Sequence, residues 1–246
     1  AAKQVERDVQ SALESLSSSL GEQMASVVCA MHCCVIGHTC LQVSVEAQRK
    51  KWCVSSNGEK IDFEGLFPYW LEQHGVPNNV SLSQLVLLTA PNMSGKSTLM
   101  RAICSGSLLS TCGLFVPAEK ASVPGNIDSF FLRMVGGDSP ADHQSAFAVE
   151  VEGIRSVIEQ STSDSLVLID EFGRGTSSSD GAALAAAVLE ALSEKGCRCI
   201  FATHLHELQH LDLKLASADL WKMHTMVEGK EIRWTYQVES GICTDS

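Results

Sequence analysis

The stretch Ala90-Pro91-Asn92-Met93-Ser94-Gly95-Lys96-Ser97-Thr98 decides the fold of this chain. It follows the apolar run 85–88 and precedes the apolar-rich stretch 99–103, an order typical of a strand, a tight loop and a helix. The stretch fits the pattern G-x-x-x-x-G-K-[ST] of phosphate-binding loops, with Ala90 in place of the first glycine. Alanine is accepted at that position if the backbone keeps a negative φ. The stretch therefore predicts a nucleotide site between a strand and a helix.

The chemistry of such a loop gives roles to its residues. Successive backbone N–H groups point inward and hold phosphate oxygens, and the positive end of the following helix dipole adds to the attraction. We expect Lys96 to reach the β- and γ-phosphates of ATP and Ser97 to ligate Mg²⁺. The expected ATP contacts extend along the whole loop, from Ala90 to Thr98.

A second apolar run, Ser165-Leu166-Val167-Leu168-Ile169, ends in Asp170-Glu171. Continuous apolar residues are typical of a strand that is buried on both faces of a parallel sheet. An aspartate at the end of such a strand is placed to hold Mg²⁺ through water, and the neighbouring glutamate to polarise the attacking water as a general base. A solvated acidic pair is the alternative, and a phosphate loop on the same chain disfavours it.

A third buried-strand pattern, Cys199-Ile200-Phe201-Ala202-Thr203, ends in His204. The carboxyl ends of parallel strands form the edge at which ligands bind in open α/β sheets. We expect His204 to contact the γ-phosphate and sense its presence. A packed or surface histidine is the alternative.

Composition limits the remaining possibilities. With 246 residues, of which 45% are hydrophobic, the chain is long enough for one sizeable α/β domain and an additional piece. The net charge of −11 argues against this segment being a main DNA-binding surface, because phosphate contacts need Lys and Arg. Ten cysteines without a secretory segment favour free thiols in a reducing compartment. The Cys- and His-rich stretch 29–40 is expected to be a helix face, a zinc site being the alternative.

The first 58 residues differ in pattern from the rest. Apolar residues recur at helical spacing from Val5 to Leu20, and Gly21 is expected to separate this helix from the next. The apolar stretch 24–41 contains two histidines and a glycine, which argues against a membrane span. The turn-rich residues 55–58 mark the boundary to the α/β part, in which 232–238 alternates as a strand does. The chain begins without Met, and we expect it to be a fragment of a longer protein.

Several longer motifs resemble the MutS family of DNA mismatch-repair ATPases. They occur in family order between about residues 60 and 246: Val76-Pro77-Asn78-Asn79-Val80, the phosphate loop, Asp170-Glu171-Phe172-Gly173-Arg174-Gly175-Thr176-Ser177 with Asp180-Gly181, and Phe201-Ala202-Thr203-His204. Within the family, the chain looks most like the plant organellar MutS homologue. The stretches that carry this likeness are Gln48-Arg49-Lys50-Lys51-Trp52, Leu66-Phe67-Pro68-Tyr69-Trp70, Gly113-Leu114-Phe115-Val116-Pro117-Ala118-Glu119 and Thr203-His204-Leu205-His206.

The resemblance implies a fold and further site residues. It implies a P-loop NTPase of the ABC-ATPase type, with a mostly parallel sheet flanked by helices over 59–246 and an all-α lever segment over 1–58. In this family two protomers complete each other's nucleotide sites. Ser145 matches the signature position, so we expect it to touch the γ-phosphate that the other protomer binds. Val76 and His224 match positions that pack on adenine; ordinary core or surface roles are the alternative.

The resemblance also implies a function. We expect Mg²⁺-dependent ATP hydrolysis at composite dimer sites that drives a clamp on mismatched or recombining DNA, with DNA contacts mainly outside this segment. The partner would be a second MutS-type protomer, either identical or different. No membrane association is expected. The compartment would be the mitochondrion or plastid if the organellar likeness holds, and otherwise the nucleus. Two alternatives stay open: a meiotic-type homologue that acts on recombination intermediates, and a non-hydrolytic dimer module that only holds nucleotide.

Overall fold

The computed structural model describes residues 2–134, 146–173, 175–203, 215, 217–228 and 231–242. The chain divides into two compact units, Ala1–Arg49 and Lys50–Ser246. Each unit is described by itself.

The first unit consists of one continuous helix, α1 (Ala2–Lys50). The expected break at Gly21 is wrong, because a single glycine costs a helix only about 1 kcal/mol and strong helix formers flank it. Apolar side chains such as Leu13 and Leu20, both 57% exposed, lie uncovered along α1. Among the described residues, α1 is the one helix that is long and apolar enough to cross a membrane. Core helices of soluble proteins and signal sequences meet the same criteria, so this finding alone places nothing in a membrane.

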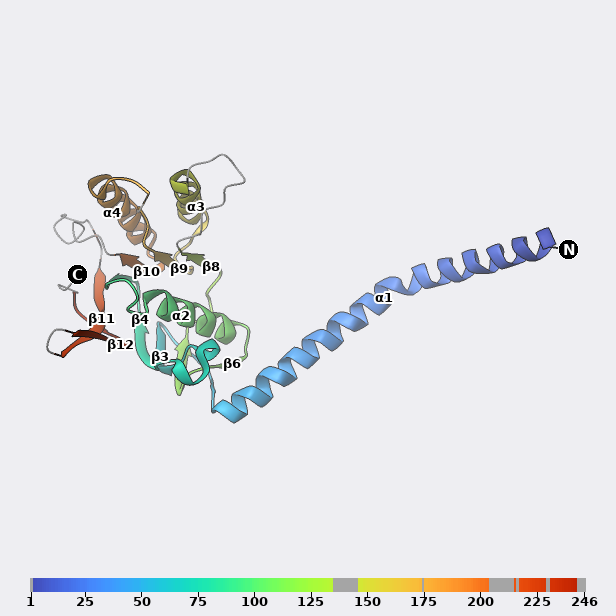
Figure 1. Ribbon diagram of the computed structural model, residues 1–246, viewed down its shortest axis with the longest axis horizontal. Coiled ribbons are helices and arrows are strands. Elements are labelled where there is room, and N and C mark those ends of the chain that lie inside the picture. Colours follow the sequence, from blue (N-terminus) through green and yellow to red (C-terminus); the bar gives the residue numbers. More distant parts are fainter. Residues whose placement is uncertain are drawn as a thin grey trace. The chain divides into compact units, whose positions relative to one another are not determined.

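The second unit is built on a six-stranded sheet with the order β12-β11-β5-β10-β9-β8 (Figure 1). Its strands are β5 (Leu85–Thr89), β8 (Phe130–Arg133), β9 (Leu166–Asp170), β10 (Arg198–Thr203), β11 (Ala218–Glu228) and β12 (Glu231–Ser240). Every neighbouring pair is parallel except the β11–β12 hairpin. The prediction of an α/β fold with a mostly parallel sheet is confirmed, and so is the strand predicted over 232–238.

Helices cover both faces of this sheet. Helix α2 (Lys96–Thr111) lies on one face, and α3 (Ala146–Gln160) and α4 (Ser178–Lys195) lie on the other (Figure 1). Strand side chains alternate between two hydrophobic cores: Leu88 packs in the core that contains Met100 of α2, whereas Leu87 packs in the core that contains Leu189 of α4. Because both faces are covered, the interiors of the central strands β5, β9 and β10 are continuous apolar runs, and polar residues stand only at their ends.

Smaller sheets extend the α2 side. A four-stranded sheet has the order β2-β7-β3-β4, and β1 pairs with β6. The strands are β1 (Cys53–Val54), β2 (Ser56–Asn57), β3 (Ile61–Leu66), β4 (Asn78–Leu82), β6 (Phe115–Val116) and β7 (Lys120–Val123), and a 3-10 helix, η1 (Tyr69–His74), lies between β3 and β4. The resemblance implies an all-α segment over 1–58, whereas α1 ends at Lys50 and strands lie at 53–54 and 56–57, next to the turn-rich residues that mark the boundary. The partners of these two strands lie more than sixty positions along the chain, so local pattern gives no sign of the pairing.

The cysteines of the described residues are all free thiols. Burial raises the pKa of Cys197 to about 11 and raises the pKa of Cys199 well above its ordinary value. These two thiols therefore stay neutral at physiological pH and behave as small apolar core residues. Among the described residues, no group of three or more His, Cys, Asp or Glu side chains is arranged to hold a metal ion.

Candidate functional site

The predicted phosphate loop joins β5 to α2. Gly95 has a left-handed backbone with φ +100° and is the N-cap of α2, and Met93 also has a positive φ of +65°. Ser94 Oγ donates to the carbonyl oxygen of Pro91 at 2.8 Å, which closes the loop on itself. Ala90 does not take a positive φ, so the residue that departs from the glycine pattern is conformationally unstrained.

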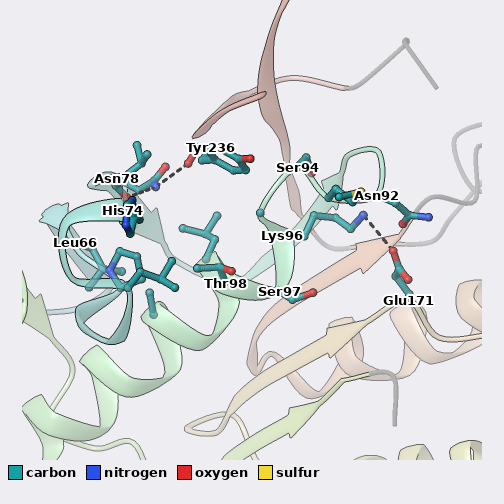
Figure 2. Close-up of a pocket in the computed structure, with 17 residues that line it drawn as sticks. Leu66, His74, Asn78, Asn92, Ser94, Lys96, Ser97, Thr98, Glu171 and Tyr236 are labelled. Atoms are coloured by element: carbon teal, nitrogen blue, oxygen red, sulfur yellow. Dashed lines mark hydrogen bonds and ion pairs between the residues drawn. The ribbon is translucent and has the colours of Figure 1, made fainter. Parts of the chain in front are cut away.

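Lys96 has three acceptors for its ammonium group. Its Nζ lies 2.9 Å from the carbonyl oxygen of Ala90 and 3.2 Å from that of Pro91. It also lies 3.1 Å from Oε1 of Glu171, the contact that Figure 2 marks with a dashed line. The side chains of Lys96 and Glu171 are only 4% and 8% exposed. The cation expected at the phosphates is therefore paired in this structure with the carboxylate expected to act as the base.

Ser97 and Asp170 meet next to this ion pair. Ser97 lies in the first turn of α2, Asp170 ends β9, and the Ser97 hydroxyl donates to Oδ2 of Asp170. A hydroxyl oxygen and a carboxylate oxygen in contact are hard ligands of the kind that Mg²⁺ prefers, usually with waters and phosphate oxygens in the remaining positions. The two residues thus fit the Mg²⁺ site that the sequence predicts.

The backbone turns sharply at Glu171. This residue has φ +56°, an unusual value for a residue with a side chain, and its N–H donates to the carbonyl oxygen of Ala202 in β10 at 2.8 Å. Two residues later, the N–H of Gly173 donates to Oε1 of Glu150 on α3 at 3.1 Å. The segment that carries the candidate base is therefore tied to both β10 and α3.

The same segment packs backbone to backbone against the start of α4. Gly173 has φ +92°, and a Cβ placed on Gly181 would lie 2.6 Å from the Gly173 carbonyl oxygen. No side chain fits at that distance unless one backbone shifts. Glycine at both positions is therefore a steric requirement of the turn that follows Asp170-Glu171.

Replacing Gly181 with alanine is expected to lower the free energy of unfolding by about 1–3 kcal/mol. The added methyl group would clash with the backbone of Gly173, which cannot move aside as a flexible side chain could. Urea unfolding followed by tryptophan fluorescence measures the change, since every tryptophan lies at or beyond Trp52. The matched control is Gly37→Ala on α1, where nothing lies within 4 Å of the added Cβ. Equal unfolding midpoints for the two variants would contradict the steric argument.

A cavity of about 690 Å³ opens beside the phosphate loop. One end is lined by loop and helix residues 92–99 and by Glu171. The other end is lined by Leu66, Pro68, Leu71, His74, Val76 and Asn78 from the β3–β4 region, together with Tyr236 of β12. The cavity thus has a polar end, suited to phosphates, and a mainly apolar end, suited to a nucleobase.

The structure brings together most of the predicted site residues. Asn92 to Thr98, Val76 and Glu171 line the cavity, Ala90 and Pro91 contact Lys96 through their carbonyl oxygens, and Asp170 contacts Ser97. His224 does not line this cavity; its Nδ1 lies 3.0 Å from Oγ1 of Thr235. Ser145 and His204 lie outside the described residues, so their roles stay predictions.

Sequence reasoning missed Tyr236. It lies 141 positions after Gly95 in a segment with no recognisable motif. It reaches the site because β11 pairs with β5 and brings β12 with it as a hairpin. Only that strand order, which no local pattern encodes, places Tyr236 beside the phosphate loop.

Comparison with known proteins agrees with this geometry. The family MutS domain V matches residues 86–246, more than half of the chain. The chain is 37% identical to the mitochondrial DNA mismatch repair protein MSH1 of Arabidopsis thaliana, over 95% of this chain and 22% of that protein. It is 37% identical to DNA mismatch repair protein MutS of Caldicellulosiruptor saccharolyticus, over 70% of this chain and 20% of that protein. It is 48% identical to DNA mismatch repair protein MutS of Thermus thermophilus, over 56% of this chain and 17% of that protein.

The chain spans about a fifth of the length of these relatives. The likeness to a plant organellar homologue that the sequence indicates is confirmed by the match to mitochondrial MSH1. The phosphate loop, the Asp-Glu pair and the family match all lie in the second unit. This chain therefore belongs to the MutS family of DNA mismatch-repair proteins.

Proposed function

We propose that the second unit is an ATP hydrolase that uses Mg²⁺ and powers a MutS-type repair protein. The observation that carries the proposal is the cluster of the buried Lys96, Asp170 and Glu171 with the half-buried Ser97 beside a phosphate loop. A cation, a hydroxyl and two carboxylates at one sheet edge are the side chains that phosphoryl transfer requires.

The site offers a direct route to hydrolysis. The N–H groups of the loop and of the first turn of α2 bind the phosphate oxygens, and Lys96 leaves Glu171 for the β- and γ-phosphates. Glu171, freed from its partner, accepts a proton from the water that attacks the γ-phosphorus, while the bond from that phosphorus to the β–γ bridging oxygen breaks and ADP leaves. Mg²⁺, held by Ser97 and Asp170, would neutralise charge on the phosphate oxygens. The ion pair thus couples nucleotide binding to release of the base.

The finer parts of the proposal rest on family membership. At the nucleotide, they are composite sites completed by Ser145 of a second protomer, contact of His204 with the γ-phosphate, and packing of Val76 and His224 on adenine. For the whole protein, they are an ABC-type arrangement, a lever role for α1, and a clamp on DNA in an organelle. One contact within the chain connects the helix that follows the signature position to the proposed base. Helix α3 begins directly after Ser145, and its Glu150 accepts the N–H of Gly173, so a change at the start of α3 has a short path to Glu171.

A mixing experiment tests both the hydrolysis and the composite site. Lys96→Met removes the ammonium from a protomer's own site, and Ser145→Phe removes the hydroxyl offered to the partner. We expect each variant alone to be inactive. In an equal mixture half of the dimers contain both variants and each has one intact site, so a quarter of the wild-type ATP turnover is expected.

The other outcomes are equally informative. Turnover by Ser145→Phe alone would contradict the role of Ser145 in the partner's site but leave the hydrolase intact. ATP binding by the unmodified chain without turnover at any protein concentration would indicate a module that only holds nucleotide. Absence of ATP binding would contradict the proposed function itself.

A further inference from the structure

A carboxylate of α3 binds the backbone two residues after the proposed base. Oε1 of Glu150 accepts the N–H of Gly173 at 3.1 Å, and the Glu150 side chain is half-buried. Hydrogen bonds with an ionised acceptor are roughly twice as strong as those between neutral groups. This bond therefore fixes the peptide group that joins Phe172 to Gly173.

Two apolar contacts hold the same segment against α3. Phe172 is 3% exposed and packs in the core that contains Ile154 of α3. A Cβ placed on Gly175 would lie 2.9 Å from Cβ of Phe147, so the backbone at Gly175 rests on that side chain. The segment after Glu171 therefore follows the surface of α3, and Glu150 adds a directional bond to these contacts.

The backbone of Glu171 is held on both sides. Its own N–H donates to the carbonyl oxygen of Ala202 at 2.8 Å, and two residues later Glu150 binds the N–H of Gly173. Between these bonds Glu171 has φ +56°, a left-handed value that is costly for a residue with a side chain and persists only where its surroundings impose it. Loss of the bond from Glu150 would let this turn relax and would displace the Glu171 carboxylate.

The position of this carboxylate depends more on its backbone once ATP binds. The ammonium of Lys96 lies 3.1 Å from Oε1 of Glu171 and helps to hold it. Under the proposed function Lys96 moves to the phosphates, and that support is lost. A displacement of about 1 Å can slow a reaction between positioned groups about 10²-fold. A residue that fixes this backbone therefore affects the chemical step.

We propose, on the basis of the proposed function, that Glu150 is a positioning residue that holds the Glu171 carboxylate in place through Gly173. Among the described residues, those that line the cavity beside the phosphate loop include none from α3. Glu150 therefore acts on the base through the backbone and leaves the phosphate contacts unchanged.

Replacing Glu150 with alanine is expected to lower the kcat of ATP hydrolysis by the 246-residue chain about 10- to 100-fold. The calorimetric affinity for ATP is expected to stay unchanged. Glu150→Gln is expected to keep most of the turnover, because its amide oxygen still accepts the N–H of Gly173. In the Glu171→Gln background, Glu150→Ala is expected to cause no further loss, because the base through which Glu150 acts is already absent. Single-turnover phosphate release measures these slow rates.

Glu152→Ala is the matched control, because Glu152 lies on the same helix with its side chain 71% exposed. We expect it to hydrolyse ATP at the unmodified rate. Thermal unfolding shows whether each variant folds. If Glu150→Ala does not fold, Glu150→Asp replaces it; this variant keeps the charge, shortens the reach to Gly173 and is expected to lower kcat in the same direction.

The inference and the proposed function fail in different ways. An unchanged kcat in folded Glu150→Ala would overturn the inference and leave the proposed function standing. An equal loss in the presence and absence of Glu171→Gln would also overturn it, since Glu150 would then act independently of the base. An unmodified chain without turnover would instead refute the proposed function, and the inference with it.

Discussion

Replacement of Glu171 with glutamine is expected to lower ATP turnover about 10²–10⁴-fold, the usual contribution of a general base. The amide has nearly the same shape as the carboxylate and does not accept the proton of the attacking water. The affinity for ATP is expected to stay the same or to increase. The carboxylate of Glu171, 3.1 Å from the ammonium group of Lys96, would no longer compete with the phosphates for that group. Steady-state turnover and calorimetric ATP affinity, measured on the same sample, test both parts.

The matched control for this variant is Glu152→Gln. Glu152 lies on α3, its side chain is 71% exposed, and its ion pair with Arg155 is long at 3.8 Å. We expect this variant to hydrolyse ATP at the unmodified rate. If Glu171→Gln also hydrolysed ATP at that rate, Glu171 would not be the base, and the buried ion pair would have only a structural role.

Replacing Lys96 with methionine is expected to abolish ATP binding and to lower turnover at least about 10²–10³-fold, as loss of a charge-stabilising donor does. Methionine keeps an apolar stem of similar length, so the first turn of α2 stays packed. The change also removes the ammonium from a buried carboxylate, which costs up to about 3–5 kcal/mol of stability. ATP titration and urea unfolding measure the two effects.

The double variant Lys96→Met with Glu171→Gln separates these effects. Stability is expected to recover in part, because no buried carboxylate remains without its cation, whereas ATP binding stays lost. Lys120→Met serves as a surface control, since Lys120 pairs with Glu64 where both side chains are exposed. Retained ATP affinity in Lys96→Met would contradict the assignment of Lys96 to the phosphates.

Much of this site was predictable because its chemistry is local in sequence. The phosphate loop and the Asp170-Glu171 pair each follow an apolar run that only a buried strand explains, and the structure places both at the same sheet edge. The mostly parallel sheet follows from the same runs. The resemblance to a known family added Val76, which lines the cavity, His224, which does not, and Ser145, which lies outside the described residues.

The rest depends on contacts that sequence spacing does not encode. Tyr236 and Asn78 are 158 positions apart and meet only because β11 and β12 lie beside β5. The pairing of β1 and β2 with distant strands likewise overrides the helical pattern before them. The continuity of α1 through Gly21 shows the opposite case, in which strong helix propensity on both sides outweighs one weak residue.

The strand order has a consequence for how the protein is made. β5 lies between β10 and β11, both of which follow it by more than one hundred residues. During synthesis the apolar strand ahead of the phosphate loop leaves the ribosome long before either neighbour exists. Pairing between such distant segments is slow because a long loop must close first. The sheet edge that carries the phosphate loop is therefore completed only after β10 and β11 have been made, and until then Leu85–Thr89 is an apolar strand without its neighbours, the kind of segment that promotes aggregation.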